Sequence, residues 1–95
     1  MASVLLPDDF KNWDEATQAA FRFVTAKYPY CSAHGHGFLC YILVRNPDEA
    51  PGKPTHVSLG CEITFPAYWT WKQTEPAIWR LAAEFIRYKE IVEKT

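Results

Sequence analysis

The chain has 95 residues, enough for one domain that spans residues 1–95. Its composition is 48% hydrophobic and 16% aromatic, which argues against disorder, and its net charge of −1 removes the electrostatic argument for tight nucleic-acid binding. No apolar stretch is long enough to cross a bilayer, and the N-terminal MASVLL lacks the basic residues of a signal peptide. Three cysteines fit a reducing compartment, so we expect a cytoplasmic protein.

Residues 9–27 are predicted to form the first amphipathic helix. The preceding Pro7-Asp8-Asp9 is a helix-start signal, because acidic groups favour the positive end of the helix dipole. Pro29 ends the pattern, since proline cannot continue a helix. Apolar residues at spacings of three and four define the buried face, namely Phe10, Trp13, Ala16, Ala20, Val24 and Tyr28.

Two strands are predicted next, over residues 37–45 (GFLCYILVR) and 55–65 (THVSLGCEITF), joined by a Pro-rich loop over 46–54. An antiparallel register that places apolar residues opposite one another pairs Val44 with Val57, and Ile42 with Leu59. The same register pairs Cys40 with Cys61 and Phe38 with Ile63. The reverse face of the first strand then carries Leu39, Tyr41 and Leu43.

The segment 66–71 (PAYWTW) is predicted to be a third short strand or an aromatic loop. A second helix follows over 75–93, with Thr74 as its cap and Glu75-Pro76 in its first turn. Its core stripe is expected to hold Ile78, Leu81, Ala82, Phe85, Tyr88 and Val92. The predicted fold is an α+β domain of order α-β-β-(β)-α, with two amphipathic helices packed on a small antiparallel sheet.

This order of elements resembles that of the double-stranded RNA-binding domain. That family carries a basic, Gly-rich and Lys-Lys signature at the start of its last helix. This chain reads KQTEPAIWR there, so the resemblance stops at the order of elements and no site residue is carried over.

The stretch YCSAHGHGFLC raises the question of a metal or catalytic site. Cys31, His34 and His36 are candidate zinc ligands in a Gly-loosened loop, although their spacing matches no common zinc module. Cys31 is also the one candidate thiol nucleophile, because His34 is near it in the sequence. The alternative is an irregular loop, with Cys40 and Cys61 as small core residues. We name no catalytic residue and no cofactor.

The chain has more large apolar side chains than one small core is expected to hide. Exposed aromatic clusters mark partner surfaces, and Trp and Tyr are favoured there. Trp79 and Ile86 form a second apolar shoulder on the last helix, Tyr68, Trp69 and Trp71 crowd next to Lys72, and a third group lies on the reverse face of the sheet. The predicted partner-binding residues are Leu39, Tyr41, Leu43, Tyr68, Trp69, Trp71, Lys72, Trp79 and Ile86.

We therefore expect a small non-enzymatic protein of adaptor, immunity or inhibitor type that docks on a larger protein. Self-association as a homodimer, through the reverse face or an unpaired strand edge, is one form of this hypothesis. A second hypothesis is a single-stranded nucleic-acid binder that stacks bases on Tyr68, Trp69 and Trp71, aided by Lys72, Lys53 and Arg45. A third is a zinc-binding domain that uses the 31–36 loop.

Overall fold

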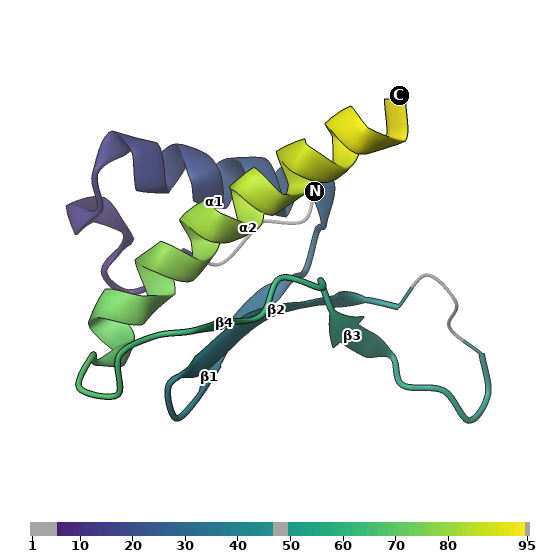
Figure 1. Cartoon of the computed structure of the whole chain (residues 1–95), viewed down its shortest axis with the longest axis horizontal. Helices are drawn as coiled ribbons and strands as arrows, with labels where there is room; N and C mark the ends of the chain where they lie inside the picture. The colour runs from purple at the N-terminus through teal and green to yellow at the C-terminus, as the bar shows by residue number, and fades with distance from the viewer. Residues whose placement is uncertain (1–5, 47–49, 95) are drawn as a thin grey trace.

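The computed structural model describes residues 6–46 and 50–94, so part of the predicted 46–54 loop lies outside the described residues. Two helices lie side by side on one face of a small antiparallel sheet, which confirms the predicted α+β class (Figure 1). The elements are a 3-10 turn η1 (Phe10–Asn12), helix α1 (Glu15–Lys27), strands β1 (Ser32–His36), β2 (Leu39–Arg45), β3 (His56–Ser58) and β4 (Ile63–Thr64), and helix α2 (Trp71–Lys94).

The first helix begins six residues later than predicted, because the chain is extended at Trp13. Asp14 is the N-cap: its carboxylate Oδ1 accepts a hydrogen bond from the Thr17 backbone N–H at 2.8 Å, and hydrogen bonds from Thr17 lower the pKa of this carboxyl. The preceding η1 turn is tied to α1 by Gln18, whose side-chain amide donates to the carbonyls of Phe10 and Trp13. The predicted helix is therefore two elements.

Strand β1 lies where the sequence analysis expects a loop. It pairs antiparallel with β2, from Ser32 opposite Leu43 to His36 opposite Leu39. The two strands are joined by the two-residue turn Gly37-Phe38, in which Gly37 has φ +64°. A positive φ at the first central position is the glycine-dependent geometry of a type II′ hairpin, so this glycine makes the hairpin accessible.

The predicted strand 55–65 is broken into β3 and β4, both of which pair with the same side of β2. The predicted pairing of Val44 with Val57 is confirmed, and the Leu59 N–H donates to the Ile42 carbonyl at 2.8 Å. Beyond Gly60, which has φ +99°, the register moves by two residues, so Cys40 pairs with Ile63 rather than with Cys61. A shift of two leaves side chains on the predicted face.

Helix α2 begins at Trp71, four residues before the predicted start, so Glu75 and Pro76 lie in its second turn. The Thr70 N–H donates to the Gln73 side-chain oxygen at 2.9 Å, which is half of a capping box. Thr74, the predicted cap, is a buried residue inside the helix, and its hydroxyl donates to the Trp71 carbonyl. The segment 66–70 is a loop with a turn, and Trp71 is the first helical residue.

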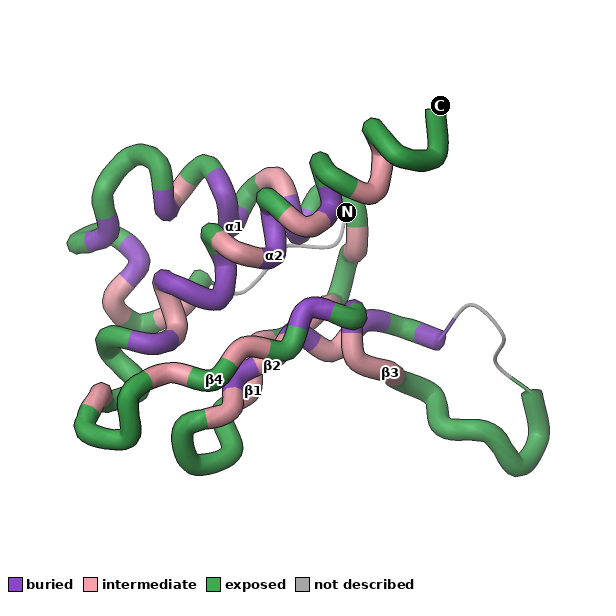
Figure 2. Tube along the Cα trace, in the orientation of Figure 1, coloured by how far each residue is buried: buried purple, intermediate pink, exposed green. Residues whose placement is uncertain are grey.

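The buried surface of α2 is wider than predicted, because α1 packs beside it. Trp79 and Ile86, expected on a partner-binding surface, are only 2% and 3% exposed. The Trp79 ring meets Phe21 of α1 edge-on, with centroids 4.8 Å apart, and farther along Glu90 forms an ion pair with Lys27 of α1 at 2.6 Å. Tyr88 and Val92, which were expected in the core stripe, and Phe38, which was expected on the apolar face of the sheet, are exposed. Figure 2 shows the last turns of α2 as mostly exposed.

Among the described residues, no helix combines the length and the apolar character that a membrane crossing requires.

We predict that Trp79→Ala lowers the free energy of unfolding by about 3–5 kcal/mol, because it removes a fully packed indole from the contact between the helices. Urea denaturation followed by circular dichroism measures this change. Tyr88→Ala is the matched control, since this ring is 66% exposed and its loss is expected to change stability by less than about 0.5 kcal/mol. Equal effects of the two substitutions would contradict the assigned core.

Candidate functional site

At one end of the molecule the β1–β2 turn lies next to the loop between β4 and α2 (Figure 1), and both segments carry aromatic residues. We call this surface the aromatic end and define it as Phe38, Phe65, Tyr68, Trp69 and Trp71. The two loops are joined by a hydrogen bond from the Phe65 N–H to the Phe38 carbonyl at 2.8 Å. The Phe65 and Trp69 rings stack with centroids 5.5 Å apart.

The aromatic end is only partly covered by the rest of the fold. Tyr68 is 82% exposed and Trp71 is 41% exposed, while Trp69 and Phe65 are half-buried. The adjacent Lys72 is a solvent-exposed ammonium whose Nζ lies 4.0 Å from the Asp9 carboxylate. The fold therefore brings together four of the nine predicted partner-binding residues, Tyr68, Trp69, Trp71 and Lys72, and leaves the Tyr68 and Trp71 rings exposed.

An open hollow of about 370 Å³ lies between β1 and the rings of the aromatic end. Trp71 packs against Gly35 so closely that a Cβ at Gly35 would lie 2.7 Å from Cζ3 of the indole. Gly35 pairs with the buried Cys40, so this contact is on the helix side of the sheet. The hollow is lined by Ala33, His34, Gly35, Gly37, Trp69, Trp71 and Thr74.

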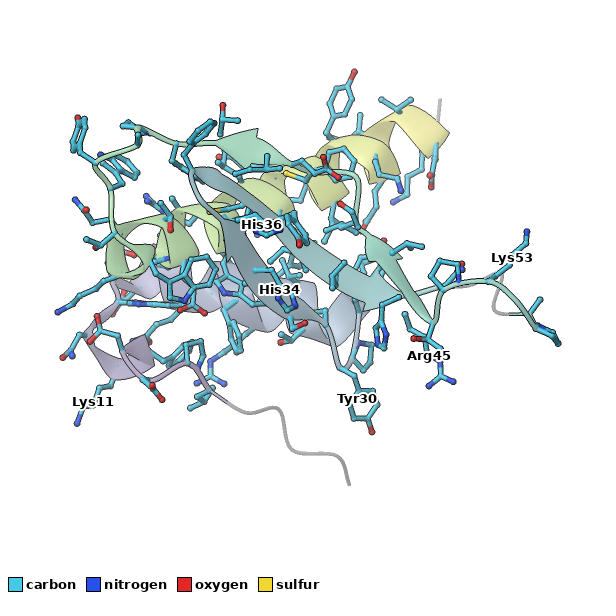
Figure 3. All side chains as sticks on the ribbon, turned by 90° about the horizontal axis from the view of Figure 1, so that it is seen from below. Lys11, Tyr30, His34, His36, Arg45 and Lys53 are labelled. Atoms are coloured by element: carbon cyan, nitrogen blue, oxygen red, sulfur yellow. The ribbon has the colours of Figure 1, made fainter. Side chains whose placement is uncertain are left out.

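The other predicted partner-binding group, Leu39, Tyr41 and Leu43, is half-buried on the opposite, outer face of the sheet. The β1–β2 register places His34 beside Tyr41, and their rings stack with centroids 5.8 Å apart. Figure 3 views this face from below, with His34 and His36 toward the viewer. The outer face is therefore separated from the aromatic end by the sheet itself.

The three candidate zinc ligands do not converge. Cys31 packs against the hydrophobic core, whereas His34 and His36 project from the outer face of β1, and the Ser32 hydroxyl lies 2.8 Å from Nε2 of His34. Within residues 6–46 and 50–94, no group of three or more Cys, His, Asp or Glu residues is placed to hold a metal ion. Burial raises the pKa of the Cys31 thiol to about 11, which opposes the thiolate form that a ligand or nucleophile needs.

The basic residues proposed to aid base stacking are not together. Arg45 ends β2, seven residues from the β1–β2 turn, and Figure 3 places Arg45 and Lys53 together at one end of the view and Lys11 at the other. A strand of this length spans about 20 Å. Of the three cations in that hypothesis, Lys72 is the one that adjoins the rings.

Sequence reasoning missed two contributors to this site, Gly35 and Phe38. Both lie in the segment expected to be a loop or the start of a strand, and Phe38 was expected opposite Ile63 on the apolar face of the sheet. The available signal is Gly37, because a glycine just before an apolar run marks a possible turn, and the resulting hairpin places Gly35 on the edge strand.

Comparisons of this chain with protein-family models, with curated proteins and with solved structures find no match.

We predict that Gly35→Ala displaces the Trp71 indole and lowers the free energy of unfolding by about 1–3 kcal/mol, because the new methyl group overlaps the ring. The measurements are urea denaturation and the NMR shift of the Trp71 indole N–H. In a Trp71→Ala background the same substitution should have almost no cost, and additive effects of the two changes would rule out the contact.

We also predict that Cys31 is alkylated slowly. With the pKa raised from 9.0 to about 11, the thiolate fraction at pH 8 is about 100-fold lower than that of an ordinary cysteine. Iodoacetamide labelling of the native protein with peptide mapping measures the rate, and urea-unfolded protein is the control that restores it. Labelling of native Cys31 as fast as in the unfolded chain would contradict the burial of this thiol.

Proposed function

We propose that this chain is a non-enzymatic protein-binding domain, of adaptor, immunity or inhibitor type, that docks on a larger protein through its aromatic end. The observation that carries the proposal is the exposure of Phe38 on the β1–β2 turn, of Tyr68 on the loop before α2 and of Trp71 at the start of α2, although the core is already filled by other rings. Clusters of exposed rings with polar neighbours are typical of partner surfaces, and Trp and Tyr supply much of the binding energy there.

Two further features support docking by this surface. Trp71 is held against Gly35 and Trp69 is stacked on Phe65, so these rings are ordered before a partner arrives. Binding by pre-ordered side chains loses less conformational entropy than binding by mobile ones. The cations needed for a nucleic-acid strand are, by contrast, spread over the molecule, so charge favours a protein partner.

The test compares matched variants in affinity capture from a lysate of the source organism. Trp71→Ala and Tyr68→Ala are expected to lose the partner, with affinities reduced by about tenfold or more, because each removes a ring from the docking surface. Tyr88→Ala is the control, since it removes an equally exposed ring elsewhere. Retention of the same partner by all three variants would contradict docking at the aromatic end.

A tryptophan fluorescence titration with single-stranded oligonucleotide, at low and at high salt, distinguishes protein docking from the alternative hypothesis of single-stranded nucleic-acid binding. Protein docking predicts no quenching at either salt concentration. Quenching that weakens as salt increases would instead assign the rings to base stacking.

A further inference from the structure

Strand β1 is an edge of the sheet with unpaired backbone groups. In a two-residue hairpin the residues that flank the turn form a hydrogen-bonded pair, here His36 and Leu39. By the alternation of an antiparallel ladder, the peptide groups of Ala33 and Gly35 then point away from β2, toward the open side of β1. These two residues therefore offer two N–H donors and two carbonyl acceptors to another strand.

The usual protections of an edge are missing from β1 and present on the other edge. Proteins block strand edges with proline, with charged side chains, with bulges or with very short strands. The five residues of β1 include no proline, lysine, arginine or carboxylate. The opposite edge consists of β3, with three residues, and β4, with two, interrupted at Gly60 and flanked by Pro54 and Pro66. Of the two edges, β1 is thus the one suited to receive a strand.

The hollow beside the aromatic end adjoins this edge, and Ala33 and Gly35 belong to its lining. Side chains of an added strand alternate between the two faces of the sheet, so every second residue would point to the helix side, where the Trp69 and Trp71 rings lie. The residues that line the hollow include no lysine, arginine, aspartate or glutamate. The exposed lining is more polar than apolar, so an apolar side chain in the hollow would take its contacts from the Trp69 and Trp71 rings.

We propose that β1 receives an extended, uncharged segment of the partner protein as an added strand, with one apolar side chain packed on the exposed part of the Trp71 ring. This inference rests on the proposed function and specifies how the partner is held. In this mode main-chain hydrogen bonds supply affinity and the hollow supplies specificity. Charge complementarity selects this occupant over a nucleic-acid strand, whose phosphates would meet a lining that includes no lysine or arginine.

The arrangement of the helices also favours a single segment over a second copy of this domain. In Figure 3, α1 extends past the free side of β1. A second copy paired through its own β1 would bring its α1 toward this one on the same side of the joint sheet. A single extended segment has no helix layer and avoids that collision.

The experiment uses the full chain and a phage-displayed library of random peptides of about eight residues, somewhat longer than a typical strand. Selection on the wild type, with counter-selection on Trp71→Ala, is expected to enrich uncharged peptides with a large apolar residue. NMR then follows the enriched peptide: we expect the Ala33 and Gly35 amides, which face solvent in the free protein, to exchange at least about tenfold more slowly in the complex.

Substitution at Ala33 isolates the backbone contribution. Ala33→Pro removes an outward N–H that makes no bond to β2, so the fold should persist while the peptide binds about tenfold more weakly. Ala33→Ser is the matched control, because it changes the side chain and keeps the N–H. Circular dichroism establishes that both variants are folded.

The outcomes distinguish the two proposals. Peptide binding that shifts the Trp69 and Trp71 indole signals without slowing exchange at Ala33 and Gly35 overturns the added strand and leaves docking at the aromatic end in place. Enrichment of no peptide over the Trp71→Ala counter-selection overturns the added strand as well, and sedimentation that shows a dimer broken by Ala33→Pro assigns the edge to a second copy instead. If the natural partner is retained by Trp71→Ala, by Tyr68→Ala and by Ala33→Pro, the proposed function itself is overturned.

Discussion

The edge-on contact between Trp79 of α2 and Phe21 of α1 determines how the rest of the molecule is arranged. The rings lie 4.8 Å apart, and Phe21 also meets Phe10 and Trp13 edge-on, so four aromatic residues join α1, α2 and the η1 turn. Such pairs contribute about 0.5–1.5 kcal/mol each beyond the area that they bury. Once this side of α2 is committed to α1, the neighbouring side faces the sheet, and Trp71, seven residues before Ile78, lies over Gly35.

This arrangement explains why both helices were predicted correctly as amphipathic elements, whereas Trp79 and Ile86 of α2 were wrongly expected to be exposed. Hydrophobic periodicity identifies which side chains share a face of a helix. The expected shoulder formed by Trp79 and Ile86 exists, and it is an interface, but its partner is α1. A residue pattern within one helix carries no information on which neighbour covers each face, because that depends on the crossing of two elements that are far apart in the sequence.

The sheet shows the same division between local and tertiary information. The central strand β2 was predicted because its six apolar residues in a row are unambiguous, and opposing Val44 to Val57 was correct because both strands bury one face. Strand β1, with its glycine and two histidines, has poor intrinsic β-propensity, and its pairing with β2 overrides that propensity. The break at Gly60 was readable as a glycine inside a strand pattern, yet the two-residue shift beyond it was not. For the candidate site, the aromatic cluster in 66–71 was recognised from the sequence. Its position next to the β1 edge was not, because β1 was not predicted as a strand.

Gly35 connects the fold to the proposed site. A glycine in a strand costs about 0.5–1 kcal/mol relative to alanine, and β1 is a short edge strand with little stability to lose. The cost is offset by the close approach of Trp71, which no residue with a Cβ permits. Because Gly35 has no side chain on the helix side of β1, the space next to the indole stays open. Gly35 thus weakens β1 as an isolated strand and at the same time keeps one position of its edge accessible. An added strand would supply the second pairing that β1 lacks.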